Sequence, residues 1–233
     1  MEIEFIPHNE MAKAIFDPPV PAINMIPESY KGIPYMIEKD KLFKLPDNKS
    51  TNLSAKACIP FFDAMTSGYM ITSQADVYAV KRPDYNYRLM WEVSWDVITE
   101  HGDQQYNPME KPVGFEKDPF KWETFWTIKT PPGYSCLFIH PTHRYDLPFM
   151  SISGVVDTDT YNLPINFPFF LKEDFEGLIP KGTPIIQVIP FKRDEWTHKI
   201  SDIDPNSQFY LDDLKSVLER SYKKRMWSKK IFK

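Results

Sequence analysis

Residues 127–191 read as a series of short strands separated by turns, and this series constrains the fold more than any other part of the chain. Alternating or strongly apolar segments predict strands at 122–129, 133–139, 148–156, 163–171 and 183–191. Turn-forming pairs lie between them, among them Pro132-Gly133 and Lys181-Gly182. Short strands that end with a turn into a last apolar strand are typical of a small barrel. We therefore predict a mainly β protein.

The composition agrees with a β-rich chain. It contains 22 prolines against 8 glycines, with 15% aromatic residues. Proline fixes φ and lacks the backbone donor, so this density shortens strands and disfavours long helices. A length of 233 residues suits one large domain, or one domain with arms. The net charge of −4 indicates no general affinity for nucleic acid.

The termini and cysteines bear on the compartment. The chain has two cysteines, which is too few for a disulfide framework. Its first residues lack the basic and apolar regions of a signal peptide, and no apolar run is long enough to span a membrane. We expect a cytoplasmic or virion-associated protein that does not bind membranes.

Three regions are expected: an extended arm with polar loops (1–56), a β-barrel domain (57–200) and a basic amphipathic helix or tail (201–233). Five prolines within residues 17–34 argue against regular helix and favour extended backbone. The same stretch contains Val20, Ile23 and Tyr30, which are too apolar for a free linker. It is predicted to be an ordered arm that wraps its own barrel or a neighbouring subunit.

The first half of the barrel domain has weaker signals. A short helix is expected at 57–65, and strands are expected at 68–71 and 75–80. Trp91, Val93, Trp95 and Val97 alternate with polar residues, which predicts one strand over 87–97 with a single packed face. Residues 99–121 lack a period and predict a long loop that is functional or packed on a partner.

The C-terminal region is the only strongly basic segment. Asp204 or Asn206 is a suitable N-cap for a helix. The predicted partner-binding surface on this region consists of Arg220, Lys223, Lys224, Arg225, Trp227, Lys229 and Lys230. Three interpretations remain open, namely a solvated helix end, a contact with an acidic protein partner, or a contact with nucleic acid.

Three motifs follow one another in the β-rich region. Pro132-Gly133 precedes a segment that ends at Arg144, residues 154–161 read G-V-V-D-T-D-T-Y, and Lys181-Gly182 precedes Gln187. Their order resembles the dUTPase/dCTP deaminase superfamily, over roughly a quarter to a third of the chain. The resemblance implies a distorted β-barrel or jelly roll, here with a Pro-rich N-terminal arm and a C-terminal α-helix. It also implies a homo-oligomer, with a trimer favoured.

The resemblance implies a nucleotide site as well. Asp157 would hold the sugar hydroxyl and help to orient a water, which makes it the candidate catalytic residue. Tyr161 would pack under the deoxyribose, and Arg144 and Gln187 would complete the ligand-binding set. Such a hydrolase would use Mg²⁺, whereas no cofactor is predicted otherwise.

The chain departs from the family pattern at the positions that such chemistry needs. Tyr161 lies one residue further from Asp157, and residues on a strand change faces at each step. Tyr145-Asp146 follows Arg144 where the family has small phosphate-binding residues, and no Gly-rich C-terminal arm is present. Phosphoanhydride hydrolysis depends on holding and neutralising phosphates. Asp157 and Asp159 have a simpler interpretation, since Asp side chains commonly satisfy the backbone of turns.

His140 and His143 are weak candidates for metal ligands. Pro141 places them in a loop, and a third ligand such as Asp146 or Asp157 would have to come from elsewhere in the fold. Hydrogen bonding to the loop backbone is the alternative, and a cupin-like metal enzyme is a third functional option. The zinc site of the deaminases is excluded because the chain has no C-x-x-C motif.

Two functional hypotheses follow. The first is a non-enzymatic assembly or interaction protein on a dUTPase-like β scaffold, by analogy a structural or accessory protein of a virus or phage. In this case its N-terminal arm and C-terminal tail would bind protein partners. The alternative is a deoxynucleotide-binding or -hydrolysing enzyme that uses the hairpin with Asp157 and Tyr161.

Overall fold

The computed structural model describes residues 1–38, 53–82, 87–207 and 221–233. Most of the regular structure in these ranges is β-strand, with a few short helices, which confirms the predicted mainly β class. In this part of the chain, no helix combines the length and the apolar character needed to cross a lipid bilayer.

The strands are β1 (Glu4–Pro7), β2 (Val20–Pro21), β3 (Tyr69–Thr72), β4 (Val77–Lys81), β5 (Tyr87–Met90), β6 (Ile98–Glu100), β7 (Phe120–Trp122), β8 (Trp126–Lys129), β9 (Tyr134–Ile139), β10 (Phe149–Ser151), β11 (Gly154–Val156), β12 (Phe167–Leu171), β13 (Gly177–Ile179) and β14 (Pro184–Lys192). The helices are α1 (Glu10–Ile15), α2 (Glu28–Lys31), α3 (Ile59–Thr66) and α5 (Ser221–Arg225), with 3-10 turns η1 (Ala22–Met25), η3 (Ala55–Ala57) and η4 (Asp103–Gln105).

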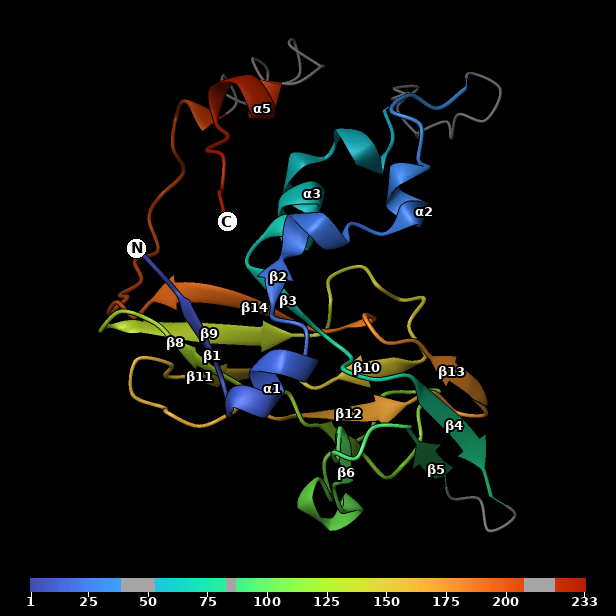
Figure 1. The fold of residues 1–233 in the computed structure, drawn as a ribbon. Helices are drawn as coiled ribbons and strands as arrows, with labels where there is room; N and C mark the ends of the chain where they lie inside the picture. The colour runs from blue at the N-terminus through green and yellow to red at the C-terminus, as the bar shows by residue number, and fades with distance from the viewer. Residues whose placement is uncertain (39–52, 83–86, 208–220) are drawn as a thin grey trace.

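Within the described residues, the strands form four antiparallel sheets. The largest has the order β11-β9-β14-β3-β2, and the second has the order β10-β12-β7-β6. A three-stranded sheet (β13-β4-β5) and the pair β1-β8 complete the described structure. Figure 1 shows β9 and β14 in one layer and β12 in the layer below. Within the described ranges none of these sheets closes on itself into a barrel, and the two main sheets pack face to face.

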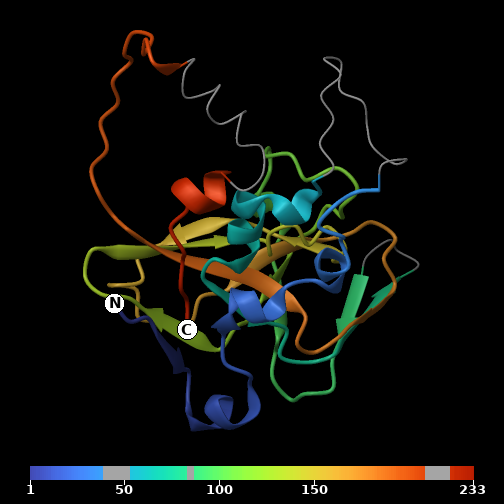
Figure 2. The ribbon, with the colours of Figure 1, turned by 90° about the horizontal axis from the view of Figure 1, so that it is seen from above.

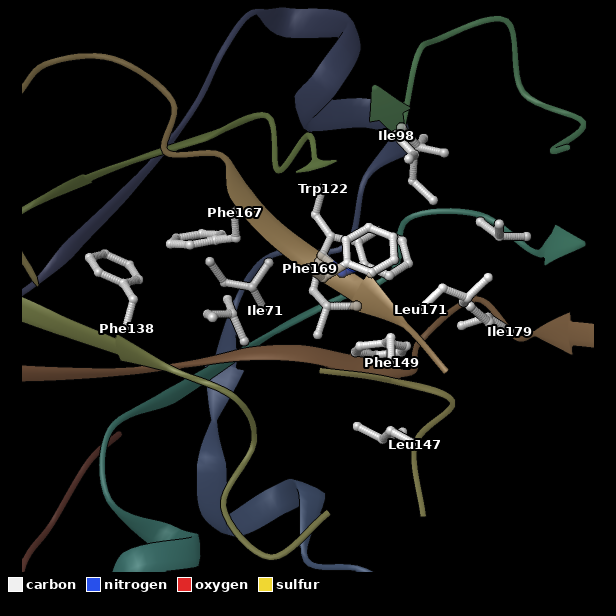
Figure 3. Packing of buried hydrophobic residues seen from close by; sticks show 14 of the residues in the cluster. Ile71, Ile98, Trp122, Phe138, Leu147, Phe149, Phe167, Phe169, Leu171 and Ile179 are labelled. Atoms are coloured by element: carbon white, nitrogen blue, oxygen red, sulfur yellow. The ribbon is translucent and has the colours of Figure 1, made fainter. Parts of the chain in front are cut away.

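Aromatic side chains from both main sheets fill the space between them. Trp122 on β7 stacks on Phe169 of β12, with ring centroids 4.4 Å apart, and Phe149 of β10 meets both rings edge-on. Phe138 of β9 packs against Phe167 at 4.8 Å (Figure 3). Each such buried side chain contributes about 1.5–3 kcal/mol relative to exposure. This core holds the loops at both ends of β9 in place.

The Pro-rich arm packs on its own chain. β2 pairs with β3, and Tyr30 is buried against Phe61 and Phe62. The expectation of extended backbone throughout the arm was wrong, because η1 and α2 form between its prolines. Pro21 and Pro27 stand at the N-caps of these turns, where no helical backbone donor is needed.

The predicted strand over 87–97 is shorter than expected. β5 ends at Met90, where its pairing with β4 also ends. The alternation nevertheless marks the packed side, since Trp91, Val93 and Trp95 are half-buried. Trp95 meets the rings of Phe16 and Phe125 edge-on, at 5.8 and 5.7 Å. The alternation therefore predicted burial correctly, although loop packing and not strand pairing produces it.

Two predicted segments fall largely outside the described residues. The polar stretch at 38–53 is described only at its ends, and residues 208–220, with Arg220, belong to the predicted C-terminal helix. Beyond them, α5 ends at Arg225 and the last residues return to the body of the protein (Figure 1).

Candidate functional site

The corner after β11 is organised around Arg193, which follows β14. The Arg193 guanidinium donates through Nη1 to Oδ1 of Asp159 at 2.8 Å and through Nη2 to Oδ2. The backbone N–H of Gly133 donates to the same carboxylate at 2.8 Å. The Asp159 side chain is 6% exposed. Hydrogen bonds from Arg193 and then from Gly133 lower the pKa of Asp159 to about 2.

Asp157 belongs to the same corner but is more open. Its Oδ1 accepts from the Ser135 hydroxyl at 2.7 Å and lies 3.1 Å from Nη1 of Arg193. Its side chain is 62% exposed, and Tyr161 is 41% exposed. The backbone N–H of Tyr161 donates to the carbonyl of Asp157. The predicted catalytic carboxylate is thus already engaged by a cation and a hydroxyl of its own chain.

The Arg193–Asp159 pair predicts a pH dependence of stability. Because the folded pKa of Asp159 lies below its ordinary value of 3.8, the ionised carboxylate stabilises the fold above about pH 4. That contribution is lost as the pH falls from about 4 to about 2. In urea titrations, the free energy of unfolding of wild type should fall more steeply over this interval than that of Asp159→Asn. Parallel curves would contradict the pairing, since the other carboxylates are common to both proteins.

Gln187 on β14 uses all its polar groups within the fold. Its Oε1 accepts from the backbone N–H and the hydroxyl of Thr142, at 3.1 and 2.7 Å. Its Nε2 donates to the carbonyls of Ala64 and Ser67, at 2.8 and 2.7 Å. The side chain is fully buried. It therefore ties α3 and the loop after β9 to the central sheet, which leaves no group of this predicted ligand residue facing solvent.

A surface cavity of about 510 Å³ lies beside that loop, in the size range of small-molecule sites. Arg144 lines it and forms a two-pronged pair with Asp146, with Nε–Oδ1 and Nη2–Oδ2 both at 2.9 Å. This hydrogen bonding lowers the pKa of Asp146. Buried Leu147 and Phe149 contribute apolar lining, and the exposed Lys172 stands at the rim. Arg144 lines this cavity and Asp157 does not.

The two histidines also line this cavity. Nδ1 of His140 accepts from the N–H of Ser151 at 3.2 Å, and Nε2 lies 3.1 Å from the carbonyl of Arg144, so a neutral ring satisfies both. Burial lowers the pKa of His140, which favours that neutral form. His143 stacks on Phe61 at 3.7 Å. Among the described residues, no three metal-ligating side chains gather at one point.

The basic tail folds back on the protein. The indole N–H of Trp227 and the ammonium of Lys230 both donate to Oδ2 of Asp63 on α3, at 2.8 and 2.7 Å. Phe232 meets the ring of Tyr69 edge-on. Other predicted partner-binding residues remain exposed, namely Lys223, Lys224, Arg225 and Lys229. Asp63 thus holds part of the predicted partner surface against the body.

The segment 193–207, called the assembly arm below, was missed by the sequence reasoning. Every residue in it is exposed. Trp196, Ile200 and Ile203 are 89%, 92% and 89% exposed. The arm, drawn in orange, leaves the end of β14 and runs away from the sheets (Figures 1 and 2). Single exposed apolar residues are ordinary, but here three large apolar side chains on one segment are left almost fully exposed.

Comparisons with known proteins found structural likeness but no sequence match. No protein-family model and no curated protein sequence matches this chain. Among solved structures, a mutant dUTPase from phage phi11 of S. aureus, described with a structural Mg(II) ion, matches 59% of this chain and 83% of its own. The identity is 13% and the TM-score is 0.31. A likeness at this level transfers neither activity nor ligand.

Proposed function

We propose that this protein is a non-enzymatic assembly or interaction protein whose copies associate through the assembly arm. The observation that carries the proposal is the near-complete exposure of Trp196, Ile200 and Ile203 on one segment. Removing a side chain of this size from water stabilises a complex by about 1.5–3 kcal/mol. Tryptophan is also among the residues that most often dominate interface energies.

The base of the arm is fixed, which favours binding. The backbone N–H of Arg193 donates to the carbonyl of Gly133 at 2.8 Å, while its guanidinium is held by Asp159. A segment that is already oriented loses less conformational freedom on association than a free tail. The corner with Asp157 and Asp159 then serves to direct the arm.

The nucleotide-enzyme alternative has less support. Asp157 is engaged by Ser135 and Arg193, Gln187 is buried, and Arg144 is neutralised by Asp146. The assembly proposal includes a closed homo-oligomer, with the trimer implied by the sequence motifs as the preferred state. The exposed lysines of the tail are proposed as a further surface for an acidic protein partner, and nucleic acid is the other candidate there.

The proposal predicts that the arm controls the oligomeric state. Sedimentation equilibrium should give wild type a mass that is a multiple of 27.4 kDa. Replacing Trp196, Ile200 and Ile203 together by Ala should weaken association by about 3 kcal/mol or more, which is roughly a hundredfold loss or greater. The matched control replaces Met109, Val113 and Leu163 by Ala, which are exposed apolar residues outside the arm.

The control variant should associate like wild type. At concentrations low enough for wild type to be dissociated, both variants should keep the wild-type thermal unfolding transition, because these positions lie on the surface. Equal association of the arm variant and wild type would overturn the proposed function.

A further inference from the structure

We infer that the cavity beside Arg144 is the receptor for the assembly arm of a second copy, with Trp196 as the side chain that enters it. This inference rests on the proposed function and names the surface to which the arm binds. It links two features of the chain, namely the almost fully exposed indole of Trp196 and an apolar cavity of about 510 Å³.

The cavity suits an indole. Its lining includes Leu147 and Phe149, which are 6% and 1% exposed, and the half-buried Phe115 and Met150. Interface anchors are typically aromatic side chains that fill pockets of this apolar kind. His140 and Arg144 already form hydrogen bonds with neighbouring residues. An apolar side chain that enters the cavity therefore does not desolvate an unpaired charge on either of them.

The charges at the two surfaces are complementary. Glu195 directly precedes Trp196, and Lys172 stands at the cavity rim. Over the residues that the structure describes, neither side chain has an ion-pair partner. With Trp196 in the cavity, the adjacent carboxylate would lie at the rim, near the ammonium of Lys172. Rim charges of this kind guide the approach of the partners and fix their register.

The arm cannot fill the cavity of its own chain. The backbone N–H of Arg193 is hydrogen-bonded to Gly133, just before the start of β9. The cavity begins at His140, just after the end of the same strand. Strand geometry puts these points about 20 Å apart. Trp196 is three residues from Arg193, so its backbone reaches at most about 11 Å, and the arm runs away from the sheets (Figure 2).

An arm-to-cavity contact is heterologous, because each copy presents one arm and one cavity. Repetition of the contact closes a ring when its rotation allows and otherwise continues as a filament. This asymmetry allows donor and receptor to be inactivated separately.

The test uses two variants of the full chain. Trp196→Ala removes the donor, and Ser153→Trp places a bulky side chain at an exposed residue of the cavity lining. In sedimentation velocity each variant alone should associate at least about tenfold more weakly than wild type. An equimolar mixture should form a complex of two copies and nothing larger, since one intact arm and one intact cavity remain per pair. A mixture without that complex would overturn the inference.

A charge exchange tests the same contact without altering the cavity walls. Glu195→Lys and Lys172→Glu should each weaken association several-fold, and the double variant should recover most of the loss. The outcomes distinguish the two claims. If Ser153→Trp and Lys172→Glu associate like wild type while the triple Ala variant of the arm does not, the arm binds elsewhere and only the receptor is refuted. If the triple variant also associates normally, the proposed function fails as well.

Discussion

Gly68→Ala is expected to lower the free energy of unfolding by about 3 kcal/mol or more. Gly68 precedes β3 with φ +75°, and a Cβ there would lie 1.9 Å from the carbonyl oxygen of Val188 on β14. The left-handed conformation costs a non-glycine residue about 1–2 kcal/mol. Relief of a backbone clash in a packed region adds about 1–3 kcal/mol. β3 and β14, which are neighbours in the main sheet, would have to move apart.

Substitutions at two other glycines measure the cost of the left-handed conformation separately from the cost of the clash. Gly114 has φ +82°, and a Cβ added there would have no other atom within 4 Å, while Gly154 has open space without a positive φ. In urea unfolding, Gly114→Ala should cost about 1–2 kcal/mol and Gly154→Ala less than about 0.5 kcal/mol. A Gly68→Ala protein no less stable than Gly114→Ala would show that the close approach of β3 and β14 is wrong.

Gln187→Leu should have a comparable effect, although the two side chains are similar in size. The substitution leaves four groups without their hydrogen-bond partner, namely the N–H and hydroxyl of Thr142 and the carbonyls of Ala64 and Ser67. Each buried group without a partner costs about 1–3 kcal/mol, so a total loss of about 3 kcal/mol or more is expected. Chemical denaturation of wild type and variant measures it.

Thr142→Val is the matched control for Gln187→Leu. It removes the hydrogen bond from the Thr142 hydroxyl, keeps the other three, and should cost about 1 kcal/mol. If Gln187 instead served a ligand, Gln187→Leu would leave stability unchanged and abolish binding of a deoxynucleotide in calorimetry. That pair of results would restore the sequence-based assignment of this residue to a ligand site.

The β-strands were predictable because their signals are local. β9 and β14 coincide with apolar runs bounded by Pro, Gly or charged residues, while β8 covers only the second half of the strand predicted at 122–129. The end of β5 at Met90 was not predictable, because the alternation of a strand continues to Trp95, which packs on Phe125 of a loop. The alternation of apolar residues indicates which side of a segment is buried. Whether that segment pairs with a neighbouring strand depends on tertiary contacts.

The candidate site was predictable only in part, since its residues come from distant segments. The hairpin with Asp157 was recognised, but its cation Arg193 lies after the last strand, where K-R-D-E reads as an ordinary polar end. The arm carried no signal either, because W-T-H-K-I-S-D-I has neither strand nor helix periodicity. Gln187 matched a motif, yet its role depends on α3 and Thr142, which only the fold brings to it.

The oligomeric mass of the unmodified chain tests the central claim most directly. Sedimentation velocity over a range of micromolar concentrations should show a species whose mass is a multiple of 27.4 kDa and whose fraction rises with concentration. A single species of 27.4 kDa at every concentration would contradict the proposed assembly, because the assembly arm would then remain bare in solution.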